Sequence, residues 1–274
     1  KVYRSGTNLL ELANQANQGS FPPFKAAAFD KALLQASDQW AFVNAESFSR
    51  WQEHLHQWVK VQYLSPISGG AESYAALITR AGKMTADNIA SSEGGRSLLD
   101  RIFSVVERAR ILSFLRNGMY GCTVINDVIA DQLIHFFDPS AKRQPDGFSG
   151  ALVIITRNDY SKELFNGDVG VIIKDAHETY RAFFHRSGAY ISFPVNLLPS
   201  WEFAFAMTVH KSQGSEFDDV LLVLPDDENH RLLTREIVYT GITRAKKRVL
   251  LYGSQPALNT ALQRKIRRQS GLMW

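Results

Sequence analysis

The chain has 274 residues, of which 45% are hydrophobic and 21% charged, a composition that suits one large or two ordinary globular domains. No apolar run approaches the roughly 18 residues of a membrane span and no signal peptide is recognisable, so we expect no membrane association. The single cysteine, Cys122, excludes an internal disulfide framework and a cysteine metal site, and it fits a buried residue of a cytoplasmic protein. The net charge of +4 permits a nucleic-acid partner without requiring one.

The start of the chain predicts helices. Arg4 is followed by apolar residues at helical spacing: Leu9, Leu10, Leu12, Ala13 and Ala16. The double proline within residues 21–24 predicts a turn or an extended linker. A second helical pattern runs over residues 48–59, where His54 and His56 are two positions apart and so lie on different faces of a helix. Since no third ligand is near, we predict no metal site.

A long helical region is predicted over residues 74–115. Its apolar face includes Leu98, Leu99, Ile102, Phe103 and Val106, and the pattern continues to Leu115. After a break at residues 117–118, a further helix is predicted over residues 124–137, with Asn126 as its N-cap. We interpret these apolar faces as core.

Residues 148–199 show a pattern of short strands instead. Apolar runs at 152–155, 169–173, 180–185 and 189–193 are separated by turn residues, which predicts a small antiparallel barrel. Basic and aromatic side chains in this region have two equally open interpretations, as contacts for DNA phosphates and bases or as a solvated face over an ordinary core. These residues are Arg157, Lys162, Tyr180, Arg181, Phe183, Phe184, His185 and Arg186.

The last part of the chain predicts a buried parallel sheet. Strands are expected over residues 201–209, 220–224 and 248–252, with a helix over 236–243. In such sheets, functional residues gather at the carboxyl ends of the strands. Gly214 permits a ligand to approach the backbone closely. The loop around it offers groups that bind phosphate, sugar or base edges, namely Thr208, His210, Lys211, Ser212 and Gln213.

Several stretches together resemble a helicase family. Residues 207–218 resemble motif V of superfamily 1 DNA helicases, and residues 238–245 resemble motif VI. The start of the chain, where Arg4 leads into a helix, is similar to motif IV. Residues 151–170 and 267–272 are similar to the RecD family, the alpha subunits of RecBCD (exodeoxyribonuclease V) complexes.

This resemblance implies an α/β fold. Residues 1–147 and 200–274 would form the second RecA-like motor domain, with a parallel sheet and helical segments, and residues 148–199 an inserted SH3-like β-barrel. The resemblance further implies the carboxyl-terminal part of an ATP-dependent 5′–3′ DNA helicase subunit in double-strand-break repair and recombination. The implied partners are single-stranded DNA, RecB-like and RecC-like subunits, and the missing amino-terminal motor domain.

The resemblance also implies roles for single residues. Arg244 of motif VI and Arg4 of motif IV are expected to contact the γ-phosphate of ATP. Glu216 is expected to bind the ribose, with Gly214 beside the nucleotide and Gln213 linking the nucleotide and DNA sites. The residues expected to contact DNA are Thr208, His210, Lys211, Arg157 and Asn166.

An ATP-driven helicase also needs a phosphate loop and a magnesium-binding acidic pair, and neither is recognisable in this sequence. We therefore expect ATP and Mg²⁺ to act in the full-length protein, and we expect this chain alone to bind no cofactor and to be inactive. Two alternatives remain. One is a RecD-like or conjugative helicase that acts without RecBC, and the other is a non-catalytic DNA-binding or subunit-docking module.

Overall fold

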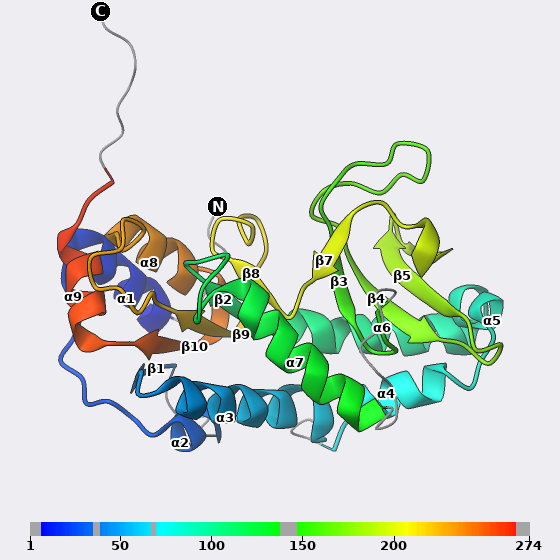
Figure 1. Cartoon of the computed structure of the whole chain (residues 1–274), viewed down its shortest axis with the longest axis horizontal. Helices are drawn as coiled ribbons and strands as arrows, with labels where there is room; N and C mark the ends of the chain where they lie inside the picture. The colour runs from blue at the N-terminus through cyan, green and yellow to red at the C-terminus, as the bar shows by residue number, and fades with distance from the viewer. Residues whose placement is uncertain (1–6, 35–38, 67–69, 138–146, 267–274) are drawn as a thin grey trace, which may run out of the picture. The chain divides into compact units, whose positions relative to one another are not determined.

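The chain forms two compact units in the computed structural model (Figure 1). The structure describes residues 7–34, 39–66, 70–137 and 147–266. The first unit consists of Lys1–Ser47, Arg110–Cys122 and Met207–Trp274. The second consists of Phe48–Ala109 and Thr123–Ala206. Among the described residues, no helix is both long enough and apolar enough to cross a bilayer.

The first unit contains a five-stranded sheet. In spatial order its strands are β1 (Trp40–Asn44), β10 (Ala245–Gly253), β9 (Phe217–Val223), β2 (Ala109–Ser113) and β8 (Ala206–Thr208). Strand β10, next to the edge strand β1, pairs in parallel with both β1 and β9. Its residues from Val249 to Tyr252 are almost completely buried, as expected for a strand covered on both faces. The predicted α/β fold with a parallel sheet is confirmed.

Helices cover this sheet. They are α1 (Thr7–Gln18), α2 (Phe29–Leu34), α8 (Arg235–Ile242) and α9 (Gln255–Gln263). Helices α1, α8 and α9 pack on one another, and α2 packs on β1. The buried residues of α1 recur at helical spacing, so hydrophobic burial of one face explains why this segment is a helix. They are Leu9, Leu12, Ala13 and Ala16.

The part of the second unit that precedes residue 138 is largely helical. Its helices are α3 (Phe48–Val59), the π-helix η1 (Lys60–Leu64), α4 (Tyr74–Ala81), α5 (Ala86–Ser91), α6 (Glu93–Arg108) and α7 (Cys122–Phe137). Ser73, Thr85 and Ser92 cap three of them, because each side-chain oxygen accepts a hydrogen bond from the backbone N–H three residues later. Helix α6 buries the apolar face that its sequence predicts. Cys122 is buried, also as predicted.

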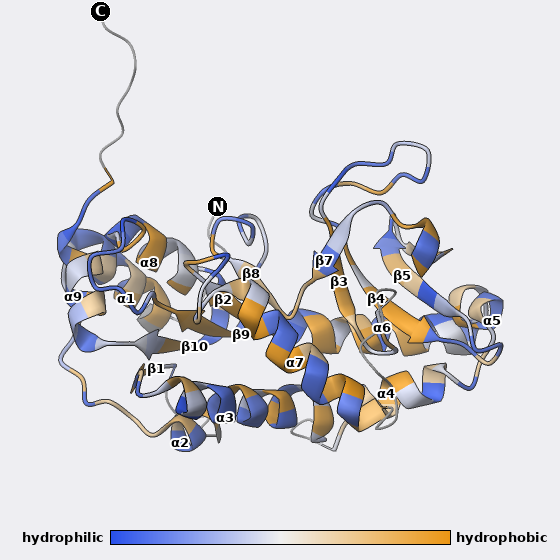
Figure 2. Cartoon of the chain, in the orientation of Figure 1, coloured by the Kyte–Doolittle hydropathy of each residue, from blue (hydrophilic) through white to orange (hydrophobic). Residues whose placement is uncertain are grey.

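The second unit also contains an antiparallel sheet, which Figure 2 shows as strands of mainly apolar residues joined by hydrophilic loops. Its strands, in spatial order, are β6 (Ala189–Pro194), β5 (Tyr180–Arg186), β4 (Val169–Lys174), β3 (Leu152–Ile155) and β7 (Trp201–Phe203). A short 3₁₀ helix, η2 (Val195–Leu197), follows β6. The four short strands predicted between residues 152 and 193 are confirmed, whereas closure of the sheet into a barrel stays a prediction.

The two units follow boundaries that differ from those of the predicted domains. Residues 48–109, which we assigned to the motor domain, belong to the same compact unit as the antiparallel sheet. Residues 148–199 are only part of that unit. The assignment of a motor domain and an inserted barrel therefore stays a prediction.

Two predictions of secondary structure are wrong. The expected strand 201–209 is two strands, because β7 pairs with β3 in the antiparallel sheet while β8 joins the parallel sheet. The helical region expected to continue to Leu115 ends at Arg108, and residues Ala109–Ser113 are instead strand β2. All five residues of β2 are buried between neighbouring strands, and a fully buried strand has the same continuous apolar pattern as a buried helix.

The predicted N-cap residue Asn126 lies inside α7 instead of at its start. Its side-chain amide donates to the carbonyl oxygens of Phe203 and Ala206, at 2.8 and 3.0 Å. Its Oδ1 accepts from the backbone N–H of Ala206 at 2.7 Å. This buried side chain therefore satisfies backbone groups at the end of β7 and at the first residue of β8.

We predict that Asn126→Ala lowers the free energy of unfolding by about 1–3 kcal/mol, because it leaves the buried backbone N–H of Ala206 without its acceptor. Urea denaturation followed by circular dichroism measures the change. His135→Ala, at an exposed position of the same helix, is the matched control and should leave the midpoint unchanged. Equal midpoints for both variants would contradict a stabilising role of the Asn126 contacts.

Candidate functional site

The connection between β8 and β9, residues 209–216, is a compact turn that we call the β8–β9 loop. The backbone N–H of Ser212 donates to the carbonyl of Thr208 at 3.2 Å, and that of Ser215 donates to the carbonyl of Ser212 at 2.9 Å. The Ser212 side chain is fully buried and donates to the carbonyl of Val209 at 2.7 Å. Ser212 therefore anchors the loop from inside instead of facing a ligand.

Val209 is also buried, but the other residues of the loop are exposed. His210, Lys211, Gln213 and Glu216 are exposed, and Thr208 is half-buried where β8 ends. The Thr208 hydroxyl accepts from the backbone N–H of Lys211 at 3.4 Å. The predicted DNA-contacting and nucleotide-contacting residues of this segment are thus all presented along one short turn.

Gly214 has a backbone φ of +95°, which side-chain-bearing residues rarely adopt. A Cβ atom at this position would meet no other atom within 4 Å, so the conformation, and not crowding, requires glycine here. The backbone beside Gln213 and Ser215 is consequently open to solvent.

Arg244 lies at the end of α8 and reaches this loop. Its Nη1 donates to the carbonyl of Ser215 at 3.1 Å, its Nε to the carbonyl of Thr240 at 3.3 Å, and its Nη2 to the Thr243 hydroxyl at 3.4 Å. A guanidinium has five N–H groups, so these three contacts fix its position and leave one N–H on each terminal nitrogen. N–H groups of a guanidinium suit an anion such as a phosphate.

The pairing of β9 with β10 explains why these segments meet. Phe217 and Ala245 are partners in the parallel register, and the backbone N–H of Phe217 donates to the carbonyl of Arg244 at 2.8 Å. Arg244 and Glu216 therefore lie at the amino ends of β10 and β9. The β8–β9 loop runs from the carboxyl end of β8 to the amino end of β9, so the predicted residues near Thr208 lie at a carboxyl end and these two at amino ends.

The basic residues after Arg244 have structural partners. Lys246 and Lys247 bind the carboxylate of Asp218, at 3.2 and 2.7 Å. Burial of Asp218 disfavours its ionised form, but the hydrogen bonds from the two ammonium groups outweigh burial and lower its pKa.

The Arg248 side chain is 13% exposed. It forms a two-point contact with Asp219, at 3.2 and 3.1 Å, and also donates to the carbonyl of Leu33 at 2.8 Å. Its guanidinium therefore ties β10 to β9 and to α2.

In the second unit, Arg157 and Asn166 lie on the loop that joins β3 and β4, residues 156–168, and both are exposed. The stacking role considered for Phe183 and Phe184 is wrong, because both rings are buried in the sheet at 0% and 1% exposure. Successive side chains of a strand point to opposite faces, so the burial of Ala182, Phe183 and Phe184 in a row shows that β5 is covered on both faces there, whereas His185 is exposed.

Three basic residues considered as phosphate contacts have partners within the unit. Arg181 binds the Ser192 hydroxyl and carbonyl, Lys162 binds Asp159, and Arg186 binds Asp168. Sequence reasoning missed the aromatic residues that are exposed on the same loop, Tyr160 and Phe165. Their position in a turn-rich segment between two predicted strands is the sequence signal that could have indicated their exposure.

The predicted site residues are thus distributed over both units. The structure brings Arg244, Gly214, Gln213 and Glu216 together with Thr208, His210 and Lys211 in the first unit, while Arg157 and Asn166 belong to the second. Arg4 lies outside the described residues. Within the described ranges, no group of three histidine, cysteine, aspartate or glutamate side chains is placed to hold a metal ion.

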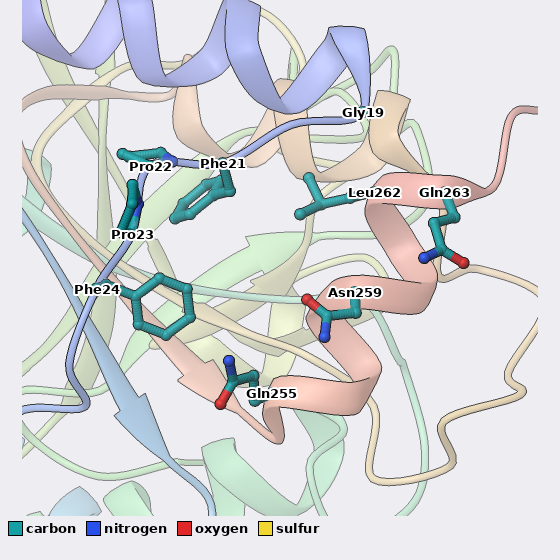
Figure 3. Close-up of a pocket in the computed structure, with 9 residues that line it drawn as sticks. All are labelled: Gly19, Phe21, Pro22, Pro23, Phe24, Gln255, Asn259, Leu262 and Gln263. Carbon is teal, nitrogen blue, oxygen red and sulfur yellow. The ribbon is translucent and has the colours of Figure 1, made fainter.

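A groove in the first unit lies between residues 19–24 and α9 (Figure 3). Figure 3 shows Gln255, Asn259 and Gln263 on one face of α9, opposite Phe21 and the two prolines. All lining residues are uncharged and none is a predicted site residue. The groove is therefore separate from the Arg244 site.

Comparison with known proteins identifies the relatives of this chain. Residues 203–252, which span β8, the β8–β9 loop, β9, α8 and most of β10, match the UvrD-like helicase C-terminal domain family. The RecBCD enzyme subunit RecD of Haemophilus influenzae is 34% identical over 194 residues, which cover 69% of this chain and 28% of that protein. The resemblance to RecD is confirmed. RecD of Mycolicibacterium smegmatis is 40% identical over 125 residues, covering 46% of this chain and 22% of that protein.

The similarity also extends to the ATP-dependent RecD2 DNA helicase of Deinococcus radiodurans, which is 36% identical over 116 residues. These residues are 42% of this chain and 16% of that protein. The chain therefore spans less than a third of each of these relatives. Their activities as whole proteins are not transferred to it by similarity alone.

Solved structures of Pif1 helicases also align with the chain. Pif1 from Candida albicans aligns over 92% of this chain and 79% of its own, with 10% identity and a TM-score of 0.36. Pif1 from Bacteroides in complex with ADP-AlF3 and ssDNA aligns over 86% and 77%, with 13% identity and a TM-score of 0.33. Both TM-scores are too low to support an argument about fold or ligands.

The ion pair of Asp159 with Lys162 at the tip of the β3–β4 loop should make the stability of the loop depend on pH. Hydrogen bonds from the Lys162 ammonium and then the Ser161 hydroxyl lower the pKa of Asp159 from 3.8 to about 2. Because the folded pKa is lowered, the ion pair stabilises the loop fully above pH 3.8 and is lost as the pH falls through about 2.

We predict that Lys162→Ala raises the pKa of Asp159 toward 3.8, since it removes the strongest hydrogen bond to the carboxylate. Carbon-detected NMR titration of the Asp159 carboxyl measures this pKa. Arg157→Ala, two residues from Asp159 in the same loop, is the control and should leave the pKa low. An unchanged pKa in Lys162→Ala would assign the shift to Ser161 and the backbone N–H of Lys162.

Proposed function

We propose that this chain is part of the second motor domain of an ATP-dependent, RecD-like DNA helicase. The observation that carries the proposal is the contact between Arg244 and the carbonyl of Ser215, which joins the segment resembling motif VI to the segment resembling motif V. The similarity to RecD and RecD2 supports the same function.

In this function Arg244 is the arginine that contacts the γ-phosphate of ATP. The fit is favourable because the guanidinium is half-buried, is held by three carbonyl or hydroxyl oxygens and keeps two N–H groups for a ligand. A fixed cation at this place stabilises the charge that spreads over the transferred phosphoryl group, so Arg244 acts on the rate of hydrolysis. Arg4, in the segment that resembles motif IV, is proposed as its partner.

The exposed segment from Gln213 to Glu216 is proposed to hold the rest of the nucleotide. Gly214 leaves the backbone open, so a ligand can approach its N–H and carbonyl groups. The exposed Glu216 carboxylate is an acceptor for ribose hydroxyls. Gln213 is the residue of this segment that comes nearest to His210 in sequence. The phosphate loop and the acidic residues that bind Mg²⁺ would come from the amino-terminal motor domain of a longer protein.

Single-stranded DNA is the proposed macromolecular substrate. Thr208, His210 and Lys211 would bind its backbone, because hydroxyl, imidazole and ammonium groups are suited to phosphate oxygens. Arg157 and Asn166 of the second unit would add contacts. ATP-driven motion of one motor domain against the other would then move the strand in the 5′–3′ direction.

The proposed cellular role is in double-strand-break repair and recombination, as a cytoplasmic subunit of exodeoxyribonuclease V with RecB-like and RecC-like partners. The RecD relatives are named as RecBCD subunits, which supports this choice. In this role the antiparallel sheet of the second unit corresponds to the SH3-like barrel of the family.

The similarity to RecD2 favours a second candidate, a RecD-like helicase that acts without RecBC. Affinity purification of the full-length protein from its own cells separates the two. Stoichiometric RecB-like and RecC-like subunits support the first candidate, and a helicase that purifies alone supports the second.

The first test is the ATPase activity of the full-length protein. We predict that Arg244→Ala lowers kcat by roughly 10³-fold or more, because an arginine that contacts the γ-phosphate contributes at about that scale. Steady-state phosphate release with saturating oligothymidine measures it. Arg231→Ala, an exposed arginine before α8, is the matched control and should retain activity. Full activity in Arg244→Ala would instead favour a non-catalytic DNA-binding or docking module.

The second test is binding of labelled oligothymidine to this chain, followed by fluorescence anisotropy at two salt concentrations. We predict weak binding that falls as salt rises and that falls further in the double variant Thr208→Ala/His210→Ala, because phosphate contacts release counterions. Ser20→Ala, at an exposed position of the first unit, is the control. Equal affinity of the double variant and the parent would show that the β8–β9 loop is not the main DNA contact.

A further inference from the structure

The loop that joins β3 and β4 projects beyond the strands of the antiparallel sheet (Figure 1). Near its tip, Tyr160 is 77% exposed, more than any other large hydrophobic side chain in the described ranges. A single exposed aromatic residue is ordinary on a protein surface, so exposure alone implies no function. The construction of the loop around Tyr160 is the informative feature.

The tip is held by an unusual number of hydrogen bonds for an exposed loop. Asp159 and Leu164 form a two-way backbone bridge, with N···O distances of 2.7 and 3.1 Å, and Leu164 is fully buried. The Asp159 carboxylate accepts from the backbone N–H groups of Ser161 and Lys162 and from the Lys162 ammonium. Tyr160 therefore sits on a backbone whose conformation is set before any ligand binds.

The Tyr160 side chain is also supported. Its ring meets that of Phe165 edge to face, with the centroids 6.0 Å apart and the planes at 74°. The Arg186 guanidinium lies over the Phe165 ring at 5.1 Å, and the Asn158 amide lies 3.4 Å from the Tyr160 hydroxyl. A ring that is both exposed and fixed loses little conformational freedom when a flat ligand stacks on it.

The charges around Tyr160 indicate whether its ring suits the base or the phosphate of a nucleic acid. Asp159 is paired with Lys162, and Asp168 with Arg186, so these four charges cancel. The remaining charged residues, Arg157 and Glu163, have opposite signs and are exposed. The loop thus has an aromatic face with no net charge, which suits the uncharged base of a nucleic acid better than its phosphate. The amides of Asn158 and Asn166 can hydrogen-bond base edges.

We propose that Tyr160 is a stacking platform for one unpaired base of single-stranded DNA, supported from behind by Phe165. This inference rests on the proposed function, because it takes single-stranded DNA as the ligand of the chain. It adds a contact to bases, which the phosphate-binding groups of the β8–β9 loop do not supply.

The test compares Tyr160→Ala, Tyr160→Leu and Tyr160→Phe in this chain, with anisotropy of labelled oligothymidine at two salt concentrations. Loss of a base stack lowers affinity by about five- to hundredfold, so Tyr160→Ala should show a loss in this range while Tyr160→Phe binds as the parent does. Tyr160→Leu should resemble Tyr160→Ala, because it keeps apolar area but no aromatic face. The loss should be the same at both salt concentrations, since no phosphate contact is removed.

A second measurement reports stacking directly. An oligonucleotide with 2-aminopurine loses fluorescence when the base stacks on an aromatic ring, so the parent and Tyr160→Phe should quench it and Tyr160→Ala should not. Leu197→Ala, at another exposed apolar position of the second unit, is the matched control and should leave affinity and quenching unchanged.

The outcomes separate the inference from the proposed function. If Tyr160→Ala binds as the parent does while Thr208→Ala/His210→Ala binds more weakly, the stacking inference is overturned and the proposed function stands. A loss for Tyr160→Ala that shrinks at high salt would also overturn it, because the effect would then be electrostatic. If the parent chain binds no oligonucleotide at either salt concentration, DNA binding by this chain and the stacking inference are both overturned.

Discussion

The parallel pairing of β9 with β10 is the interaction on which the Arg244 site depends. It sets Phe217 beside Ala245, and the hydrogen bond from Phe217 N–H to the Arg244 carbonyl places the end of α8 against the end of the β8–β9 loop. In this register the Arg244 side chain reaches the carbonyl of Ser215 at 3.1 Å. A change of register by one residue would turn the side chains of β10 to the opposite face.

Arg244 differs from its basic neighbours in what it binds. Lys246, Lys247 and Arg248 are held by the carboxylates of Asp218 and Asp219, so their charges are compensated within the protein. The recorded partners of Arg244 are carbonyl and hydroxyl oxygens, which orient a guanidinium without neutralising it. Its positive charge therefore remains available for an anion, although all four residues look alike in sequence.

In the second unit, the aromatic side chain of Tyr160 is exposed to solvent and still held in position. Phe183 and Phe184 are buried on the two faces of β5, whereas the β3–β4 loop exposes Tyr160 next to the buried Leu164. The ion pair of Asp159 with Lys162 stabilises the loop from within, and that of Asp168 with Arg186 ties it to β5. Such pairs are individually weak at a surface, and here they act together with backbone hydrogen bonds.

The sequence by itself determined the family resemblance, the parallel sheet, the short antiparallel strands and most helices, because motif spacing and hydrophobic periodicity are local properties of the chain. Only the tertiary structure decided that residues 109–113 are a strand, because a continuous apolar run fits a buried helix equally well. It alone also decided that Asn126 binds the backbone of Ala206 and not a helix end, and that Arg248 is held while Arg244 keeps free N–H groups. These outcomes depend on partners far away in the chain, which no local pattern contains.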